Sequence, residues 1–292
     1  MSFKPIYTLL DWIDIEKLYQ KLRWDELIHN RYAVDLLIEM EEIPDYYDNH
    51  IWDALSMNPN AIHLLEKNQD KIHWKLLSGR NPNAIHLLEK NPDKIDWFNL
   101  SANPNAICLL EKNQDKIHWD QLSENPNAIH LLEQQIEQDP DYIDWVELSQ
   151  NPNAIHLLEQ NPHEIYWRWL HYNPNAIHLL EQNPHEIQWY WLSQNPNAIH
   201  LLEQNQDKIN WSFLSANPNA IHLLEQNPDK IEWYSLSENP NAIHLLQQNQ
   251  DKIDWIQVAR NPSIFKLDTI KMKETCKVFA KELTEYVFHP LR

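Results

Sequence analysis

Apolar and polar residues follow a pattern that returns about every 22 residues over most of the chain. The repeating unit reads Asn-Pro-Asn-Ala-Ile-His-Leu-Leu-Glu, then a short polar stretch, then Ile-x-Trp-x-x-Leu-Ser, and its positions are numbered from the first Asn. Nine such units fill residues 58–260, and a period of this length is typical of stacked repeat proteins. The units begin at Asn58, Asn81, Asn103, Asn125, Asn151, Asn173, Asn195, Asn217 and Asn239, and Asn261 starts a further Asn-Pro pair.

The first half of each unit predicts a short helix. Ala84, Ile85, Leu87 and Leu88 occupy positions 4, 5, 7 and 8 of one unit and form an apolar stripe at helical spacing. An Asn before a Pro suits a helix start, because the Asn side chain can accept from a backbone N–H and Pro is tolerated at the first helical position. We therefore expect helices to begin within two residues of each Asn-Pro pair.

The second half of the unit carries apolar residues at positions 15, 17 and 20, for example Ile231, Trp233 and Leu236. The Asn at position 11, such as Asn227, is expected to end the first helix in the left-handed conformation that usually requires Gly. Ile231 and Trp233 would not share one helical face. Two possibilities therefore stay open for the second helix: it is continuous from position 12, or it begins near position 16.

A single unit is too small to bury its Ile, Leu and Trp side chains, so neighbouring units must stack and share a core. The sequence predicts an all-α fold without any sheet, a right-handed-type solenoid or superhelix of nine repeats with two short helices each and degenerate helical caps. With helices about 8–10 Å apart, this rod or superhelix would extend on the order of 70–90 Å.

One unit has 26 residues, and its additional residues lie between Gln134 and Asp139. They amount to about one helical turn. We expect the first helix of this unit to be longer, with Trp145 still in the common Trp column.

The two ends of the chain are predicted to cap the array. Residues 1–57 hold a leading helix and one degenerate unit, in which Trp24 and Trp52 fall in the Trp column. Residues 261–292 are expected to form a longer amphipathic helix that covers the last repeat. Its apolar face would contain Ile264, Leu267, Ile270, Val278 and Leu283.

Three stretches of the chain resemble a known family. They are the unit Asn-Pro-Asn-Ala-Ile-His-Leu-Leu-Glu-Lys-Asn-Pro-Asp-Lys-Ile-Asp-Trp at 81–97, the opening segment 7–18 and the closing segment from Asn261. These motifs are similar to those of the Asn-Pro-rich tandem-repeat proteins that giant DNA viruses of protists encode in many copies. The resemblance covers nearly the whole chain, and it implies a virus-encoded protein that acts in a host cell. It implies no enzymatic activity and no residue-level function.

Charge and cysteine content narrow the choice of partner and compartment. With 24 Lys and Arg against 43 Asp and Glu, the formal charge of −19 disfavours nucleic acid and anionic membrane surfaces, so a protein partner should be neutral or basic. Only Cys108 and Cys276 could form a disulfide, which favours a reducing compartment. Charges interrupt the first residues, so neither a signal peptide nor a membrane span is expected. We expect an intracellular protein in the host cytoplasm or nucleus, with packaging in the virion left open.

The histidines at position 6 are the most obvious candidates for chemistry. Equivalent residues of stacked units lie roughly 10 Å apart, whereas zinc ligands lie about 2.0–2.3 Å from one ion, so we predict hydrogen bonds to Asn or Glu neighbours instead of a metal site. The chain has one Gly and shows no phosphate loop or other catalytic motif, so no enzyme, cofactor or metal is predicted. The column consists of His63, His86, His130, His156, His178, His200, His222 and His244, with Cys108 in the remaining unit.

The Trp of position 17 follows the repeat and is predicted to belong to the core, whereas positions 16, 18, 19 and 22 vary between units. In the central units these variable positions hold mostly aromatic residues and one Arg, which are the residue types that dominate binding energy at protein interfaces. Two interpretations stay open, a partner-binding surface and additional packing between repeats. The candidate partner-binding residues are Tyr166, Arg168, Trp169, Tyr172, Tyr190, Trp191, Phe213 and Tyr234.

The function predicted from the sequence is that of a non-enzymatic scaffold or adaptor for protein–protein interaction, because repeat arrays provide extended binding surfaces. The alternative is a structural or self-assembling component of a virion. The sequence does not predict the oligomeric state.

Overall fold

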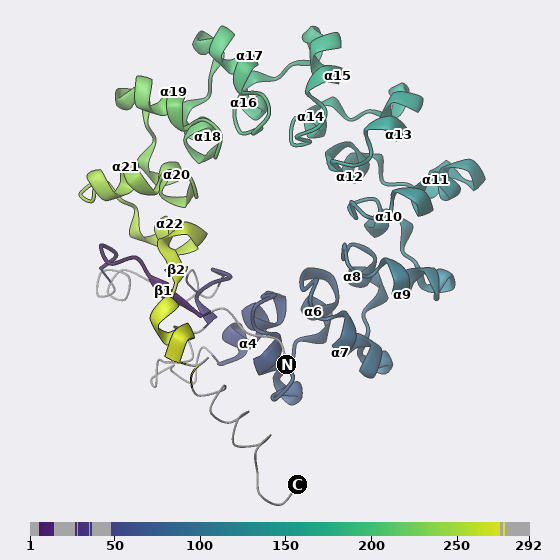
Figure 1. Cartoon of the computed structure of the whole chain (residues 1–292). Coiled ribbons are helices and arrows are strands. Elements are labelled where there is room, and N and C mark those ends of the chain that lie inside the picture. The colour runs from purple at the N-terminus through teal and green to yellow at the C-terminus, as the bar shows by residue number, and fades with distance from the viewer. Residues whose placement is uncertain are drawn as a thin grey trace, which may run out of the picture.

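The computed structural model describes residues 6–14, 27, 29–34, 36, 48–274 and 277. It confirms an all-α repeat solenoid, in which pairs of short helices recur at the spacing of the sequence repeat. The helices lie in an inner and an outer row that curve into a ring (Figure 1). The outer helices splay apart while neighbouring inner helices pack together, so the array does not extend as a rod.

The inner row contains the second helix of each repeat, and the outer row contains the first helix (Figure 1). Most repeats join the two helices by a single 3-10 turn. The inner helices are α4 (Asp48–Met57), α6 (Trp74–Arg80), α8 (Trp97–Ser101), α10 (Trp119–Leu122), α12 (Trp145–Gln150), α14 (Trp167–Leu170), α16 (Trp189–Leu192), α18 (Trp211–Ala216), α20 (Trp233–Glu238) and α22 (Trp255–Arg260). The outer helices are α5 (Ile62–Leu65), α7 (Ile85–Lys90), α9 (Ile107–Glu111), α11 (Ile129–Gln138), α13 (Ile155–Gln160), α15 (Ile177–Gln182), α17 (Ile199–Gln204), α19 (Ile221–Gln226) and α21 (Ile243–Gln248).

The Asn-Pro pair does not start a helix directly, and the prediction that helices begin within two residues of it is wrong. In the repeat that begins at Asn81, α7 starts at Ile85, and Ala84 precedes it without a side-chain cap. The Oδ1 atom of Asn81 accepts from the backbone N–H of Asn83, which closes a tight turn before the helix. The Asn thus shapes a turn, and its side-chain amide is directed to the preceding repeat.

That amide forms a buried ladder of hydrogen bonds between repeats. Asn195 is 1% exposed, and its Nδ2 atom donates to the carbonyls of Asn173 and His171 at 3.0 and 2.8 Å. The same two bonds, at 2.7–3.2 Å, recur at position 1 from Asn81 to Asn261. Each turn therefore anchors the next, and buried carbonyls that would otherwise lack a donor are satisfied.

The Ser of position 21 makes a second link between repeats. The Oγ atom of Ser193 donates to the Trp189 carbonyl at 2.7 Å and accepts from the backbone N–H of Asn210 in the next repeat at 2.9 Å. Asn210 precedes α18 and accepts from the N–H of Phe213, so it caps that helix. One small hydroxyl at the end of α16 therefore links this helix to the residue that precedes the next inner helix.

The inner helix begins at position 17, which decides between the two possibilities left open by the sequence. In one repeat Ile231 is extended, with ψ of 123°, and α20 starts at Trp233. Asn227 ends the outer helix with φ of −130°, and no described non-Gly residue has a positive φ, so the left-handed prediction is wrong. The Nδ2 atom of Asn227 instead donates to the Leu223 carbonyl at 2.9 Å, which caps the helix from an ordinary backbone conformation.

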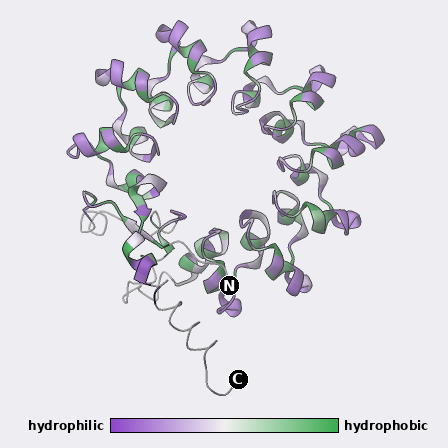
Figure 2. Ribbon diagram, viewed as in Figure 1, coloured by the Kyte–Doolittle hydropathy of each residue, from purple (hydrophilic) through white to green (hydrophobic). Residues whose placement is uncertain are grey.

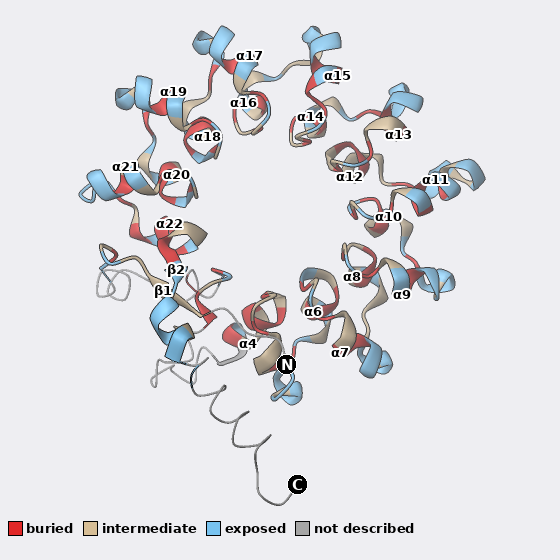
Figure 3. Ribbon diagram, in the orientation of Figure 1, coloured by how far each residue is buried: buried red, intermediate tan, exposed pale blue. Residues whose placement is uncertain are grey.

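The core lies between the two rows of helices. Apolar residues gather there, while hydrophilic, exposed residues cover the outer edge of the ring (Figures 2 and 3). Ala198, Leu202 and Leu192, at positions 4, 8 and 20, are fully buried. The Trp of position 17 rests on this core but is only partly buried in most repeats, as at Trp189, so one part of its indole remains accessible.

The 26-residue unit has the longer outer helix that its sequence predicts. Helix α11 has 10 residues, whereas α13 of the next unit has 6. Trp145 still opens an inner helix, and the backbone N–H of Asp144 donates to the Ser123 Oγ atom at 3.1 Å, as in other repeats. The insertion is therefore accommodated on the outside of the ring (Figure 1).

The two ends of the array meet and close the ring (Figure 1). Strand β1 (Tyr7–Leu9) pairs antiparallel with β2 (Phe265–Leu267), so the prediction that no sheet occurs is wrong, although both strands lie outside the nine repeats. Asn30 takes the place of a position 1 Asn, and its Nδ2 atom donates to the carbonyls of Ala259 and Asn261 at 2.8 and 2.9 Å. The buried ladder thus continues from the last repeat to the degenerate N-terminal unit.

The residues after Asn261 do not begin as the single helix that was expected. Ile264 is buried in the 3-10 turn η10 (Pro262–Ile264), and Leu267 lies in β2. Residues 269–274 are helical, with Ile270 71% exposed. Pairing with β1 takes up the segment that would have formed the first turns of the helix. The predicted residues Trp24, Val278 and Leu283 lie outside the described part of the chain.

Candidate protein-binding face

Two of the variable positions of the repeat, 18 and 22, face the inner side of the ring. They lie about 160° around each inner helix from the buried Leu of position 20, so they face away from the core, whereas position 19 lies about 100° from that Leu, on the flank of the helix. On the inner row that direction is the interior of the ring (Figure 1). Phe98, Tyr190 and Tyr234 at position 18 are 43%, 51% and 58% exposed, so this inner side is open to solvent.

Six of the eight predicted partner-binding residues join in one continuous surface over α14, α16 and α18. Each makes a ring or cation–π contact with another member, and these contacts cross from repeat to repeat. We call this surface the aromatic strip, and its members are Arg168, Trp169, Tyr172, Tyr190, Trp191 and Phe213.

Trp191 is the centre of the aromatic strip. Its ring stacks on Phe213 with centroids 5.7 Å apart, meets Tyr190 edge to face at 4.7 Å and lies 5.8 Å from Tyr172. The Arg168 guanidinium carbon lies 4.9 Å from the Trp191 ring centroid. Contacts of this kind contribute about 0.5–1.5 kcal/mol beyond the area that they bury, so they hold the strip in one arrangement.

The strip lies on top of the inner helices and is separate from the core. In the part of the chain that the structure describes, the partly buried side chains that pack against the core include Trp167 and Trp189 at position 17 but neither Trp169 nor Trp191. Trp169 and Trp191 are nonetheless only partly exposed. Their rings are therefore covered mainly by other members of the strip, and a partly exposed aromatic surface remains.

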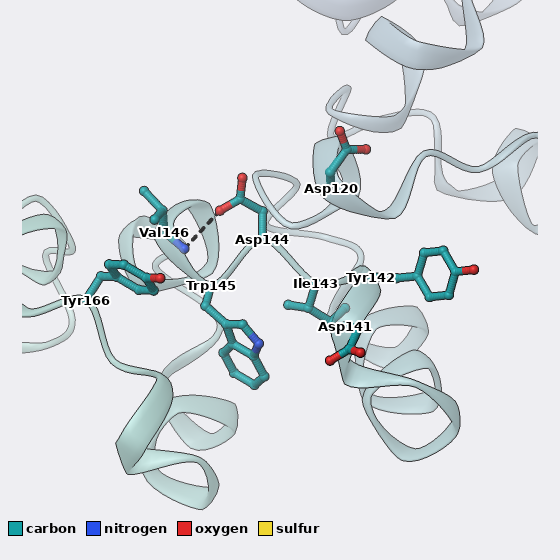
Figure 4. A pocket seen from close by; sticks show the side chains of 8 residues that line it. All are labelled: Asp120, Asp141, Tyr142, Ile143, Asp144, Trp145, Val146 and Tyr166. Carbon is teal, nitrogen blue, oxygen red and sulfur yellow. Dashed lines mark hydrogen bonds between the residues drawn. The ribbon is translucent and has the colours of Figure 1, made fainter.

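The other two predicted residues lie apart from the aromatic strip. The hydroxyl of Tyr234 accepts from the Gln257 Nε2 atom at 2.7 Å in the next repeat. Tyr166 borders an open depression of about 280 Å³ around Trp145 (Figure 4). In this view the Asp144 carboxylate turns to the backbone N–H of Val146, at 2.9 Å, while the Trp145 indole extends to the opposite side.

His171 replaces the bridging Ser of position 21 at the end of α14 and is fully buried. Its Nδ1 atom lies 2.6 Å from the Trp167 carbonyl, and its Nε2 atom lies 2.9 Å from the backbone nitrogen of Gln188 in the next repeat. Since the amide N–H donates, Nε2 accepts and Nδ1 carries the proton, which makes the ring neutral. Burial lowers the pKa of His171 below 6.5, against smaller raising effects of hydrogen bonds to the Trp167 and Arg168 backbone and of Glu186.

This burial predicts a local sensitivity to acid. The unfolded chain protonates His171 near pH 6.5, whereas the folded protein does so only at lower pH. The stability that depends on the neutral ring is therefore present above pH 6.5 and is lost as the pH falls toward the folded-state pKa, by up to about 1.4 kcal/mol per pH unit. A His171→Ser variant, with the residue that seven of the nine repeats carry, should lose less stability between pH 7.5 and pH 5 in urea titrations. Parallel losses in both proteins would contradict this assignment.

Seven of the eight position 6 histidines, from His86 to His244, pair with a Glu of the preceding repeat, in agreement with the predicted hydrogen bonds to Asn or Glu neighbours. Their Nε2 atoms lie 2.5–3.0 Å from Glu Oε1 atoms, for example 3.0 Å between His178 and Glu159. Among the described residues, no group of three or more His, Cys, Asp or Glu side chains is placed to hold a metal ion.

Sequence reasoning missed a second set of contacts, between the Lys of position 14 and the Trp of the preceding repeat. The Lys230 ammonium lies 4.5 Å from the Trp211 ring centroid, within cation–π distance. The recurrence of Lys at position 14 was the sequence signal that could have revealed these Lys–Trp contacts. The other pairs, at 4.6–5.1 Å, are Lys71 with Trp52, Lys116 with Trp97, Lys208 with Trp189, and Lys252 with Trp233.

Negative charge is concentrated in the middle of the array. Residues 117–207 contain 14 Asp and Glu but no Lys, and Arg168 is their single Arg, a formal charge of −13 out of −19 for the chain. Burial, together with the carboxylates of Glu124 and Asp144, raises the pKa of Glu147 in this region. Five of the six members of the aromatic strip, from Arg168 to Trp191, belong to this acidic, lysine-free part of the chain.

Comparisons with protein-family models, with curated proteins and with solved structures find no match to this chain. In the described ranges, no helix has the length and apolar character that crossing a membrane requires.

Proposed function

We propose that the protein is a non-enzymatic scaffold or adaptor that binds a protein partner through the aromatic strip. The observation that carries this proposal is the joining of six variable side chains, from three consecutive repeats, into one partly exposed surface outside the core. Trp, Tyr and Arg are the most frequent energetic centres of protein interfaces, because they combine a large contact area with polar groups. The surrounding negative charge favours a partner that is neutral or basic.

The closed ring favours this function over self-assembly into a larger structure. An open repeat array presents an unpaired repeat at each end, to which another copy could add. In this protein Asn30 extends the ladder from the last repeat to the degenerate N-terminal unit, so the last repeat is not left unpaired. The resemblance to repeat proteins of giant viruses extends the proposal to a virus-encoded protein that engages a host protein in the cytoplasm or nucleus.

Removal of two anchors of the strip tests the proposal. A Trp169→Ala, Trp191→Ala variant should lose its protein partners in a quantitative capture from protist host lysate. Truncation of one such anchor typically costs about 2 kcal/mol of binding, or roughly thirtyfold in affinity. Its melting temperature should fall by only a few degrees, because neither ring packs against the core.

A Phe98→Ala, Ile256→Ala variant is the matched control, because both residues are exposed on inner helices away from the strip. It should retain the partners that the strip variant loses. The same set of captured proteins with both variants, or early melting of the strip variant, would show that the strip serves packing between repeats instead.

A further inference from the structure

Contacts within the chain show that the Trp ring of position 17 can hold a positively charged side chain. Five times, the Lys of position 14 in one repeat lies over the Trp ring of the preceding repeat, with its ammonium 4.5–5.1 Å from the ring centroid. The Trp ring presents the negative face of its quadrupole to this charge. Five of the six position 14 lysines share this geometry, which makes it a recurrent property of the Trp column; the sixth, Lys94, lies 3.9 Å from the Asp93 carboxylate.

Three consecutive Trp residues do not receive this lysine. Position 14 of the following repeat holds Tyr142 after Trp119, Glu164 after Trp145 and Glu186 after Trp167. No cation–π contact of these three rings is found among the described residues, and residues 117–207 contain no lysine that could make one. We call Trp119, Trp145 and Trp167 the open Trp faces.

The surroundings of the open Trp faces are acidic, whereas five other Trp rings of the column have a lysine. Glu164 and Glu186 reverse the charge at position 14. Trp145 also lines the open depression, together with Asp120, Asp141 and Tyr166 (Figure 4). An aromatic face beside carboxylates is suited to a Lys or Arg side chain. Its positive charge is attracted both to the face of the ring and to the negative carboxylates.

We infer that the open Trp faces bind basic side chains of an extended protein segment, which take the places of the missing lysines. This inference rests on the proposed function, because it identifies the chemistry of the partner. Neighbouring inner helices are about 10 Å apart, and three residues of an extended chain also span about 10 Å. A segment with a Lys or Arg at every third residue would therefore contact the three open Trp faces in sequence.

The test uses the full-length protein and two labelled peptides of identical composition. One peptide has a Lys at every third residue among Ser and Ala, and the other has the same lysines contiguous. Binding is measured by fluorescence anisotropy at low and at physiological salt. The spaced peptide should bind at least about tenfold more tightly, because only its lysines match the repeat spacing. Equal affinity for the two peptides would overturn the inference.

Filling the open Trp faces with the chain's own lysine gives a sharper test. A Tyr142→Lys, Glu164→Lys, Glu186→Lys variant restores the residue that six repeats carry at this position, so it should fold. Its lysines should occupy the rings and weaken binding of the spaced peptide by about thirtyfold. If the triple variant melts early, Glu164→Lys is compared with Glu164→Gln, which removes the charge without filling the face; equal peptide affinity of these two would count against the inference.

The matched control changes the formal charge equally on the outer row. Gln134→Lys, Gln160→Lys, Gln182→Lys, Gln204→Lys and Gln226→Lys together add the same five positive charges as the triple variant, at exposed sites. This control should keep affinity for the spaced peptide within about threefold of wild type. Equal weakening in both variants would mean that net charge alone is responsible. That result would leave the proposed function standing if the Trp169→Ala, Trp191→Ala variant still loses its host partners, so the two failures are distinguishable.

Discussion

An Asn195→Asp variant should lose about 3–5 kcal/mol of the free energy of unfolding, the loss typical of an uncompensated buried charge. The Asn195 Nδ2 atom donates to the carbonyls of Asn173 and His171, and the side chain is 1% exposed. Aspartate would place an oxygen against these two carbonyl oxygens and leave both without their donor. Urea denaturation, followed by circular dichroism and Trp fluorescence, measures the loss.

Asn197→Asp is the control, because it makes the same chemical change two residues away. The Asn197 Nδ2 atom donates to the Pro174 carbonyl at 2.8 Å, but the side chain is exposed and water can replace that bond. We expect a loss below about 1 kcal/mol. If the two variants were destabilised equally, burial of the position 1 ladder would not be what holds successive repeats together.

The sequence predicts the repeat, the two helices of each unit and the side chains of the aromatic strip, because these features depend on local spacing. Trp169, Trp191 and Phe213 share position 19 of consecutive units, so any regular stack brings them to the same side. The longer α11 was predictable for the same reason, since four additional residues add about one turn wherever the helix lies.

The role of the Asn at position 1 could not be predicted from local spacing. An Asn before a Pro fits a helix cap, but its two amide hydrogens have partners in the preceding repeat, which a single unit does not reveal. Ring closure could not be predicted from local spacing either, because it also depends on contacts between units. The small rotation between repeats accumulates over the whole array, and Asn30 lacks the following Pro that marks the other members of the ladder. The one sequence signal that places Asn30 at position 1 is its spacing of three residues before Ala33, which matches the spacing of Asn and Ala in the regular repeats.

Opening the ring should change the shape of the protein and leave the repeats folded. In an Asn30→Asp, Leu10→Pro variant, the bonds from Asn30 to the carbonyls of Ala259 and Asn261 are lost, as is the bond from the Leu10 N–H to the Ile264 carbonyl at 2.8 Å. The junction should lose about 3–5 kcal/mol through the buried aspartate alone. Because each repeat contacts only its neighbours, helicity should stay near that of wild type while small-angle X-ray scattering shows a larger radius of gyration. An Asn241→Asp variant, altered at an exposed position 3, should keep the radius of the closed ring.

The open variant also separates two ways in which the ring could hold a partner. The aromatic strip lies on α14, α16 and α18, and the inner helices α20 and α22 separate it from the junction of β1 and β2 (Figure 1). If the strip binds its partner as a surface, the open variant should retain that partner with little change in affinity, because the contacts within the strip are local. If the partner must pass through the ring, opening should speed both its association and its release, and its residence time should fall even though every residue of the strip is unchanged. A radius of gyration equal to that of wild type would mean that the curvature is built into each repeat and that the junction only completes it.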